Sequence, residues 1–151
     1  LIQMIKAAGF RTIVKRHPKG IGSNIPIFED VASKELKQTK MADTFNQADA
    51  YVIDQVGTGF MEAMCTLKPV ILIEIPNRQL TKQARTQLNK SIVIIRATYD
   101  ENNRVTIERD RLIEGLGEPI NLEARHKFIS DYLTSSDDIR NKCDLFRKTE
   151  F

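Results

Sequence analysis

Short apolar stretches alternate with amphipathic or polar segments along much of this chain. Four of the stretches are short and rich in β-branched residues, so they predict strands rather than helices. The predicted strands lie at residues 11–16, 50–54, 70–75 and 92–95. Their hydrophobicity is continuous rather than alternating, which is typical of parallel strands that are buried on both faces.

Segments with helical spacing or strong helix formers surround these strands. The predicted helices lie at residues 1–8, 41–48, 60–67, 80–89, 108–116 and 119–132, and a last short helix begins near residues 135–138. Gly9 and Gly117 follow two of them as stop signals. Residues 100–103 predict a turn, residues 104–107 an extended segment, and residues 29–36 are compatible with one or two helical turns.

This alternation predicts an α/β fold, a single Rossmann-like doubly wound parallel sheet of about four to six strands with helices on both faces. A chain of 151 residues, 41 % of them hydrophobic, corresponds to one domain. We expect residues 1–151 to form that domain, with residues 120–151 as a helical tail. Because ligands bind beyond the carboxyl ends of strands in such sheets, the segments directly after the first three strands become candidates.

Composition narrows the class of protein further. The longest apolar run, residues 70–73, is far shorter than a membrane-spanning helix requires. The chain opens with Leu1 and lacks the order of a signal peptide, so we expect it to begin inside a longer, cytoplasmic protein. Cys65 and Cys143 are too far apart for a CxxC motif and are interpreted as reduced thiols.

The charge distribution is more informative than the net charge of +3. Residues 1–99 carry a net charge of +6 and residues 100–151 a net charge of −3, so an anionic ligand is expected in the first two thirds. With no Trp and only 7 % aromatic residues, the sequence argues against nucleic-acid binding. It contains no HExxH or GxSxG motif, and we expect no metal site and no cofactor.

A basic cluster follows the first predicted strand, in the order Lys15, Arg16, His17, Pro18. Proline restrains the residue before it, which predicts an extended His17 at the edge of the sheet. An imidazole beside two cations can donate a hydrogen bond to a phosphate. The alternative is a surface loop with solvated charges.

A glycine-rich turn joins the second predicted strand to the next helix and contains Gly57, Thr58 and Gly59. Glycine lets a backbone approach an anion closely, and the amides of a first helical turn bind phosphate oxygens. Glu62 lies one turn further, where a carboxylate could accept hydrogen bonds from ribose hydroxyls. The alternative is a tight turn in which Thr58 or Gly59 caps the helix and Glu62 favours its positive end.

One further group of polar residues and a second histidine are typical of a solvated surface. After the third strand, a phosphate or carboxylate contact is conceivable, but a solvated helix face is the preferred interpretation. This group comprises Asn77, Arg78, Gln79, Lys82 and Arg85. His126 lies on a polar helix face and is also interpreted as a surface residue.

Three segments together resemble a known family pattern. Residues 13–18 end in Lys-Arg-His-Pro, residues 48–54 read Ala-Asp-Ala-Tyr-Val-Ile-Asp, and residues 57–71 combine Gly-Thr-Gly with Glu62 and a Lys-Pro-Val-Ile strand start. The pattern resembles the carboxyl-terminal, donor-binding half of a GT-B glycosyltransferase of the kind that builds capsules and surface polysaccharides. The resemblance covers residues 11–75.

The resemblance implies particular roles for these residues. His17, as the catalytic residue, and the Gly57-Thr58-Gly59 turn contact the nucleotide phosphates, with Lys15 and Arg16 beside them, and Glu62 contacts ribose or sugar. Gly57 stands where many family members have a hydroxyl residue, so one of two expected hydroxyl donors is absent and the identity of the donor stays open.

The resemblance also implies partners. The substrate is a nucleotide-sugar, and an amino-terminal acceptor domain outside this chain supplies the general base. Peripheral membrane association belongs to the full-length protein. Two alternatives remain open: half of a sugar-nucleotide epimerase, which shares the fold, and a non-catalytic flavodoxin-like interaction module.

Overall fold

The computed structural model describes residues 1–15, 28, 31–36 and 40–132, and it is a mixed α/β structure with parallel strands. The chain forms two compact units, Leu1–Ala48 and Asp49–Phe151, and each is described by itself. Among the helices in these described ranges, none is both long and apolar enough to span a membrane. The helix predicted near residues 135–138 lies outside the described residues.

The described residues of the first unit form a short α-helix, a pair of strands and a 3₁₀ helix. Helix α1 (Ile2–Ala7) ends before Gly9, whose φ of 89° lies in the left-handed region that stops a helix. Strand β1 (Ile13–Lys15) pairs in parallel with β2 (Lys34–Leu36). A 3₁₀ helix, η2 (Ala42–Gln47), occupies most of the region predicted as the second helix.

Strand β2 corrects the helical interpretation of residues 34–36, which are extended. One turn is present just before it, where the amides of Val31 and Ala32 donate to the carbonyl oxygen of Phe28 at 3.1 and 2.9 Å, and residues 29–30 lie outside the described residues. Thr12 and Ser33, which directly precede the two strands, are joined by reciprocal hydrogen bonds. The Thr12 amide donates to Ser33 Oγ at 3.1 Å, and the Ser33 amide donates to Thr12 Oγ1 at 3.2 Å. Pairing with a distant segment therefore overrides the local helical preference of this stretch.

The second unit is built on three parallel strands that pair in chain order, β3 (Tyr51–Ile53), β4 (Val70–Glu74) and β5 (Val93–Arg96). Helix α2 (Thr58–Met64) connects β3 to β4, and α3 (Lys82–Leu88) connects β4 to β5. All five residues of the central strand β4 are buried. This agrees with the continuous hydrophobicity that predicted a sheet covered on both faces.

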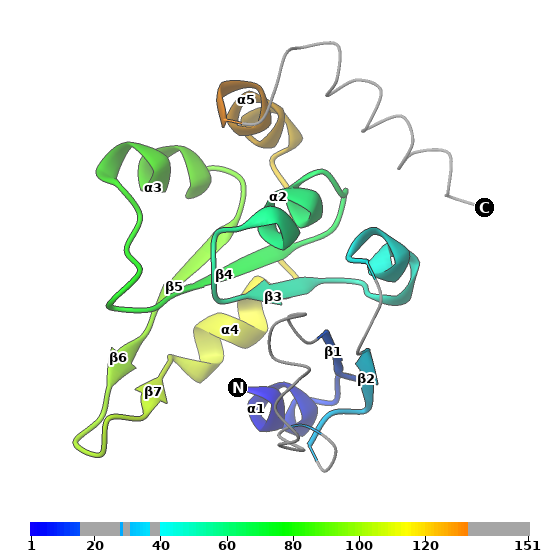
Figure 1. Cartoon of the computed structure of the whole chain (residues 1–151), viewed down its shortest axis with the longest axis vertical. Helices are drawn as coiled ribbons and strands as arrows, with labels where there is room; N and C mark the ends of the chain where they lie inside the picture. The colour runs from blue at the N-terminus through cyan, green and yellow to red at the C-terminus, as the bar shows by residue number, and fades with distance from the viewer. Residues whose placement is uncertain (16–27, 29–30, 37–39, 133–151) are drawn as a thin grey trace. The chain divides into compact units, whose positions relative to one another are not determined.

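Helices cover both faces of this sheet, as Figure 1 shows. Helices α2, α3 and α5 (Leu122–Tyr132) lie on one face, where α5 packs against the other two. Helix α4 (Arg109–Gly115) lies on the opposite face against β5. A β-carbon at Gly115 would lie 3.1 Å from a methyl carbon of Val93, so glycine allows α4 to approach the sheet closely.

Beyond β5, the chain forms an antiparallel hairpin of β6 (Thr98–Tyr99) and β7 (Val105–Thr106). The carboxylate of Asp100 accepts hydrogen bonds from the amides of Asn102 and Arg104, each at 2.8 Å. The turn predicted at residues 100–103 and the extended segment after it are therefore confirmed.

The predicted single sheet of four to six strands is not what the described residues form. Their largest sheet has three strands, and β1 pairs with β2 in a separate two-stranded sheet. The sequence could identify β1 as a strand from its β-branched residues, but strand type does not specify which strand becomes its neighbour.

One buried arginine ties α5 to the loops that precede β4 and β5. The Arg125 side chain is 1 % exposed, and Nη1 donates to the carbonyl oxygens of Thr66 at 3.0 Å and Lys68 at 2.8 Å. Its Nη2 donates to the carbonyl oxygen of Ser91 at 2.9 Å. Burial lowers the pKa of Arg125 to about 10. The cation thus satisfies carbonyl groups beyond the carboxyl ends of α2 and α3.

Candidate functional site

The glycine-bearing turn between β3 and α2 lies at the carboxyl edge of the three-stranded sheet. Gly57 is the residue that precedes the helix, with an extended backbone at φ −154°, and no side chain caps the helix there. A β-carbon at Gly57 would have no heavy atom within 4 Å. The first amides of a helix have no partners within the helix, so this turn presents hydrogen-bond donors beside open space.

Thr58 and Glu62 are the predicted site residues that lie on α2 beyond the glycine turn. Thr58 is exposed and Glu62 is partly buried. Gly57 occupies the N-cap position, rather than Thr58 or Gly59 as the alternative interpretation expected, and no side chain caps the first amides of the helix. Its first turn contains no acidic residue. The helix macrodipole stabilises a carboxylate most within the first turn, and Glu62 lies beyond that turn.

The basic half of the predicted site belongs to the other unit. Lys15 is the last residue of β1 and is partly buried, whereas Arg16 and His17 lie outside the described residues. The structure therefore describes Lys15 and the Gly57 turn in separate compact units and does not bring them together in one sheet.

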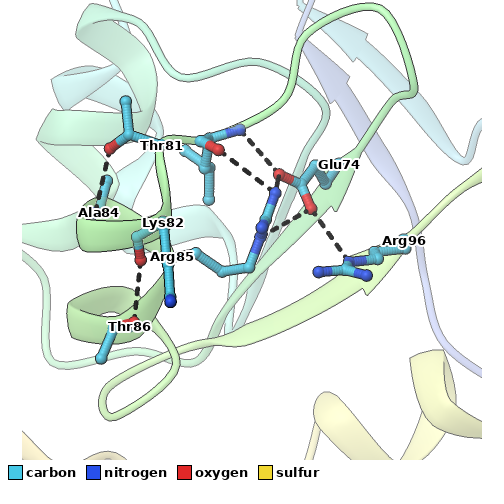
Figure 2. A network of polar contacts seen from close by, with 8 residues as sticks. Glu74, Thr81, Lys82, Ala84, Arg85, Thr86 and Arg96 are labelled. Carbon is cyan, nitrogen blue, oxygen red and sulfur yellow. Dashed lines mark hydrogen bonds and ion pairs between the residues drawn. The ribbon is translucent and has the colours of Figure 1, made fainter.

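A buried carboxylate stands at the carboxyl end of the central strand (Figure 2). Glu74 is 4 % exposed and accepts hydrogen bonds from the Leu80 amide at 2.8 Å and from Arg85 Nη2 at 2.6 Å and Nε at 3.2 Å. Arg96 Nε lies 3.6 Å from Glu74 Oε2, the oxygen that also accepts the bond from Arg85 Nε. Burial raises the pKa of Glu74, but the bonds from Arg85 and Leu80 and the charges of both arginines outweigh it and lower the pKa.

This network corrects the expectation that Arg85 lies on a solvated helix face. Its side chain is only 22 % exposed, because it turns toward Glu74. The sequence signal for this ion pair is Glu74 itself, because an acidic residue within a buried apolar strand requires a cationic partner. Glu74 is therefore a structural anchor rather than a free base.

Other polar residues at or near this edge are exposed. Arg78, in the loop after β4, donates from Nη1 to Gln55 Oε1 at 2.7 Å and so links the segments that follow β4 and β3. Asp54 is exposed directly after β3.

His126 is exposed on α5, which confirms its interpretation as a surface residue.

A small pocket lies at the opposite, amino edge of the sheet. Its volume is about 70 Å³, and it is lined by residues at the starts of β4 and β5 together with Glu118, Pro119 and Arg125. Sites for small organic ligands usually measure about 300–1,000 Å³. We therefore place the candidate site at the carboxyl edge and not in this pocket.

Neither a metal site in the described residues nor a related protein gives a more specific assignment. Within the described ranges, no three His, Cys, Asp or Glu side chains are grouped so that they could hold a metal ion. Comparison with protein-family models, with curated proteins and with solved structures found nothing that matches this chain.

Proposed function

We propose that this chain is the donor-binding part of a glycosyltransferase that uses a nucleotide-activated sugar for surface-polysaccharide synthesis. The observation that carries the proposal is the β3–α2 turn, where Gly57 leaves open space beside uncapped amides at the carboxyl edge of a parallel sheet. Backbone amides in that position suit a phosphate group. The sequence resemblance supplies the reaction class.

We further propose that the domain is a doubly wound, Rossmann-like one. Ligands in such domains bind where the strand order reverses, beside the first strand of each half. Strand β3 begins the run β3-β4-β5, and the Gly57 turn directly follows it. A reversal of strand order at β3 would place the turn at the ligand crevice.

The chemistry required of this half is stabilisation of a leaving group. When an acceptor hydroxyl displaces the nucleotide, negative charge develops on the departing phosphate, and fixed N–H donors stabilise that state more than the ground state. In the proposal, His17, Lys15 and Arg16 add hydrogen bonds and positive charge. The acceptor and the base come from an amino-terminal domain, in a cytoplasmic protein that associates peripherally with the membrane.

Binding can be tested by titrating the purified chain with UDP, GDP, CDP and CMP while following amide NMR signals. We expect shifts at residues 55–62 at millimolar nucleotide. Gly57→Ala should weaken binding roughly tenfold, since a methyl group forced between the turn and a phosphate costs about 1–3 kcal/mol. Gly117→Ala is the matched control, because its β-carbon would meet only one atom, at 3.7 Å. Absence of shifts with every nucleotide would refute the site.

The role of Glu62 has its own test. The carboxylate should accept charge-assisted hydrogen bonds from ribose hydroxyls, so Glu62→Gln should cost roughly 1–2 kcal/mol with a ribonucleotide. The loss should be smaller with the corresponding deoxyribonucleotide, as calorimetry can measure. Equal losses for both sugars would show that Glu62 does not contact ribose.

A further inference from the structure

Two exposed arginines follow neighbouring strands at the carboxyl edge of the sheet. Arg78 lies in the loop after β4, and Arg96 ends β5 with a side chain that is 70 % exposed. Each is in contact with a polar side chain from the strand before it along the sheet. Arg78 donates to Gln55 after β3, and Arg96 lies beside Glu74 of β4. The two contacts therefore span both gaps between the three strands.

Glu74 orients Arg96 without cancelling the positive charge of the cluster. The carboxylate is fixed by the Leu80 amide and by two bonds from Arg85. Figure 2 shows Arg85 and Arg96 beside it. Its single negative charge is thus already matched by Arg85. Arg96 approaches only through Nε, at 3.6 Å, which is longer than a hydrogen bond. Its guanidinium group keeps its charge and its donors for another acceptor.

Gln55 also positions an arginine, Arg78, and leaves its positive charge unmatched. The Gln55 amide oxygen accepts this hydrogen bond but carries no net charge, so it positions the guanidinium group without neutralising it. Gln55 is two residues before Gly57, and Arg78 is therefore held next to the β3–α2 turn. Within the part of the chain that the structure describes, Gln55 is the only acceptor that the Arg78 side chain engages.

Neither arginine is needed to stabilise the fold. Arg78 and Gln55 are both exposed, and Arg96, although it lies beside the buried Glu74, is itself 70 % exposed and too far from the carboxylate for a hydrogen bond. Such solvent-screened contacts contribute little to the free energy of unfolding. Arg85, in contrast, is largely buried against Glu74. Two oriented cations that add little to stability suit anion binding, since planar guanidinium groups match phosphate oxygens in geometry and charge.

We infer that Arg78 and Arg96 each bind one phosphate group, so that the donor is a nucleoside diphosphate sugar and not a nucleoside monophosphate sugar. Neighbouring strands lie about 4.8 Å apart, so two contacts centred on adjacent gaps are offset by about one strand spacing. A diphosphate can engage both gaps at once, whereas a monophosphate engages one. The inference rests on the proposed function and deepens it by naming the class of donor.

The test compares UDP with UMP, and GDP with GMP, by calorimetry on the purified chain and on single variants. We expect each diphosphate to bind at least about tenfold more tightly than its monophosphate, as an added charge-assisted contact allows. Arg78→Gln and Arg96→Gln should each remove most of that preference. Arg104→Gln, in the β6–β7 hairpin, removes the same charge elsewhere and should leave the preference unchanged.

A second variant keeps Arg78 and changes only its partner. Gln55→Glu gives the guanidinium group a carboxylate, which competes with phosphate, so the preference for the diphosphate should fall. Thermal unfolding of all four variants should match that of the parent chain, which separates a loss of binding from a loss of fold.

Failure of the diphosphate preference and failure of the proposed function give different results in these experiments. If nucleotides shift residues 55–62 but monophosphates bind as tightly as diphosphates, the proposed function stands and the inference fails. The inference also fails if Arg104→Gln weakens the preference as much as the other two variants, because net charge alone then explains it. If no nucleotide binds, both are overturned.

Discussion

Replacing Arg125 with methionine removes a buried cation while keeping most of its volume. The guanidinium group donates to the carbonyl oxygens of Thr66, Lys68 and Ser91. These acceptors belong to the backbone, so the substitution leaves them without their donor. The situation differs from replacing a whole ion pair by apolar residues, in which both partners disappear.

The expected loss follows from two opposing contributions. Hydrogen bonds to a charged group contribute about 1.5–3 kcal/mol each, so three of them amount to roughly 5–9 kcal/mol if they are additive. Burial of the cation opposes this contribution, since it lowers the pKa of Arg125 to about 10. At about 1.4 kcal/mol per pKa unit, that burial costs on the order of 3 kcal/mol, which the methionine avoids. We expect Arg125→Met to lower the free energy of unfolding by about 2–6 kcal/mol.

Urea unfolding monitored by circular dichroism measures this loss. The free energy of unfolding of Arg125→Lys should lie between those of Arg125→Met and the parent. An ammonium group keeps the charge but lacks the planar fork of donors that reaches three separated carbonyl groups. Lys127→Met is the matched control on the same helix. Lys127 is exposed and pairs with Asp131 at 3.1 Å, so its removal should cost no more than about 0.5 kcal/mol. If Arg125→Met unfolds within 1 kcal/mol of the parent, roughly the worth of one ordinary hydrogen bond, the three bonds do not hold α5 as argued.

Gly115→Ala should lower the free energy of unfolding by about 1 kcal/mol, because the added β-carbon lies 3.1 Å from a Val93 methyl carbon and this crowding outweighs alanine's helix preference; an unchanged or higher melting temperature would contradict it. Stability should fall as the pH drops below 4.5, the ordinary pKa of Glu74, since its folded pKa is lower and the contribution vanishes as pH passes through that folded value. Urea titrations from pH 7 to pH 3 should show a flatter profile for Glu74→Gln than for the parent. Under the proposed function, this chain alone should transfer no sugar from any nucleotide-sugar to an acceptor, and robust turnover in a product assay would show that it contains its own base.

The β3–α2–β4 segment was predictable from the sequence because its signals agree. Residues 50–54 and 70–75 are apolar and β-branched, Gly57 and Gly59 mark a turn, and the intervening segment contains strong helix formers. The structure places β3, α2 and β4 there, with boundaries that differ by a few residues. The candidate turn was located for the same reason, since it follows a recognisable strand.

Partners that are distant in the chain were not predictable in the same way. Strand β2 exists because β1 lies alongside it, and nothing local in Lys34–Leu36 specifies that pairing. Arg125 resembles any arginine on a polar helix, yet its contacts are 34 to 59 residues away in sequence. Such contacts depend on how helices pack, which periodicity alone does not determine.

The pairing of β3, β4 and β5 in chain order has a consequence for how this sheet folds. Each strand meets its neighbour across a single helical crossover, so the first residues of β3 and β4 are separated by 19 positions and those of β4 and β5 by 23. Closing such short loops costs little entropy, and contacts that are close in sequence form quickly. We expect the sheet to assemble in chain order during synthesis, with β3 and β4 pairing before β5 is available, and α5 to dock last, when Arg125 reaches the loops already in place.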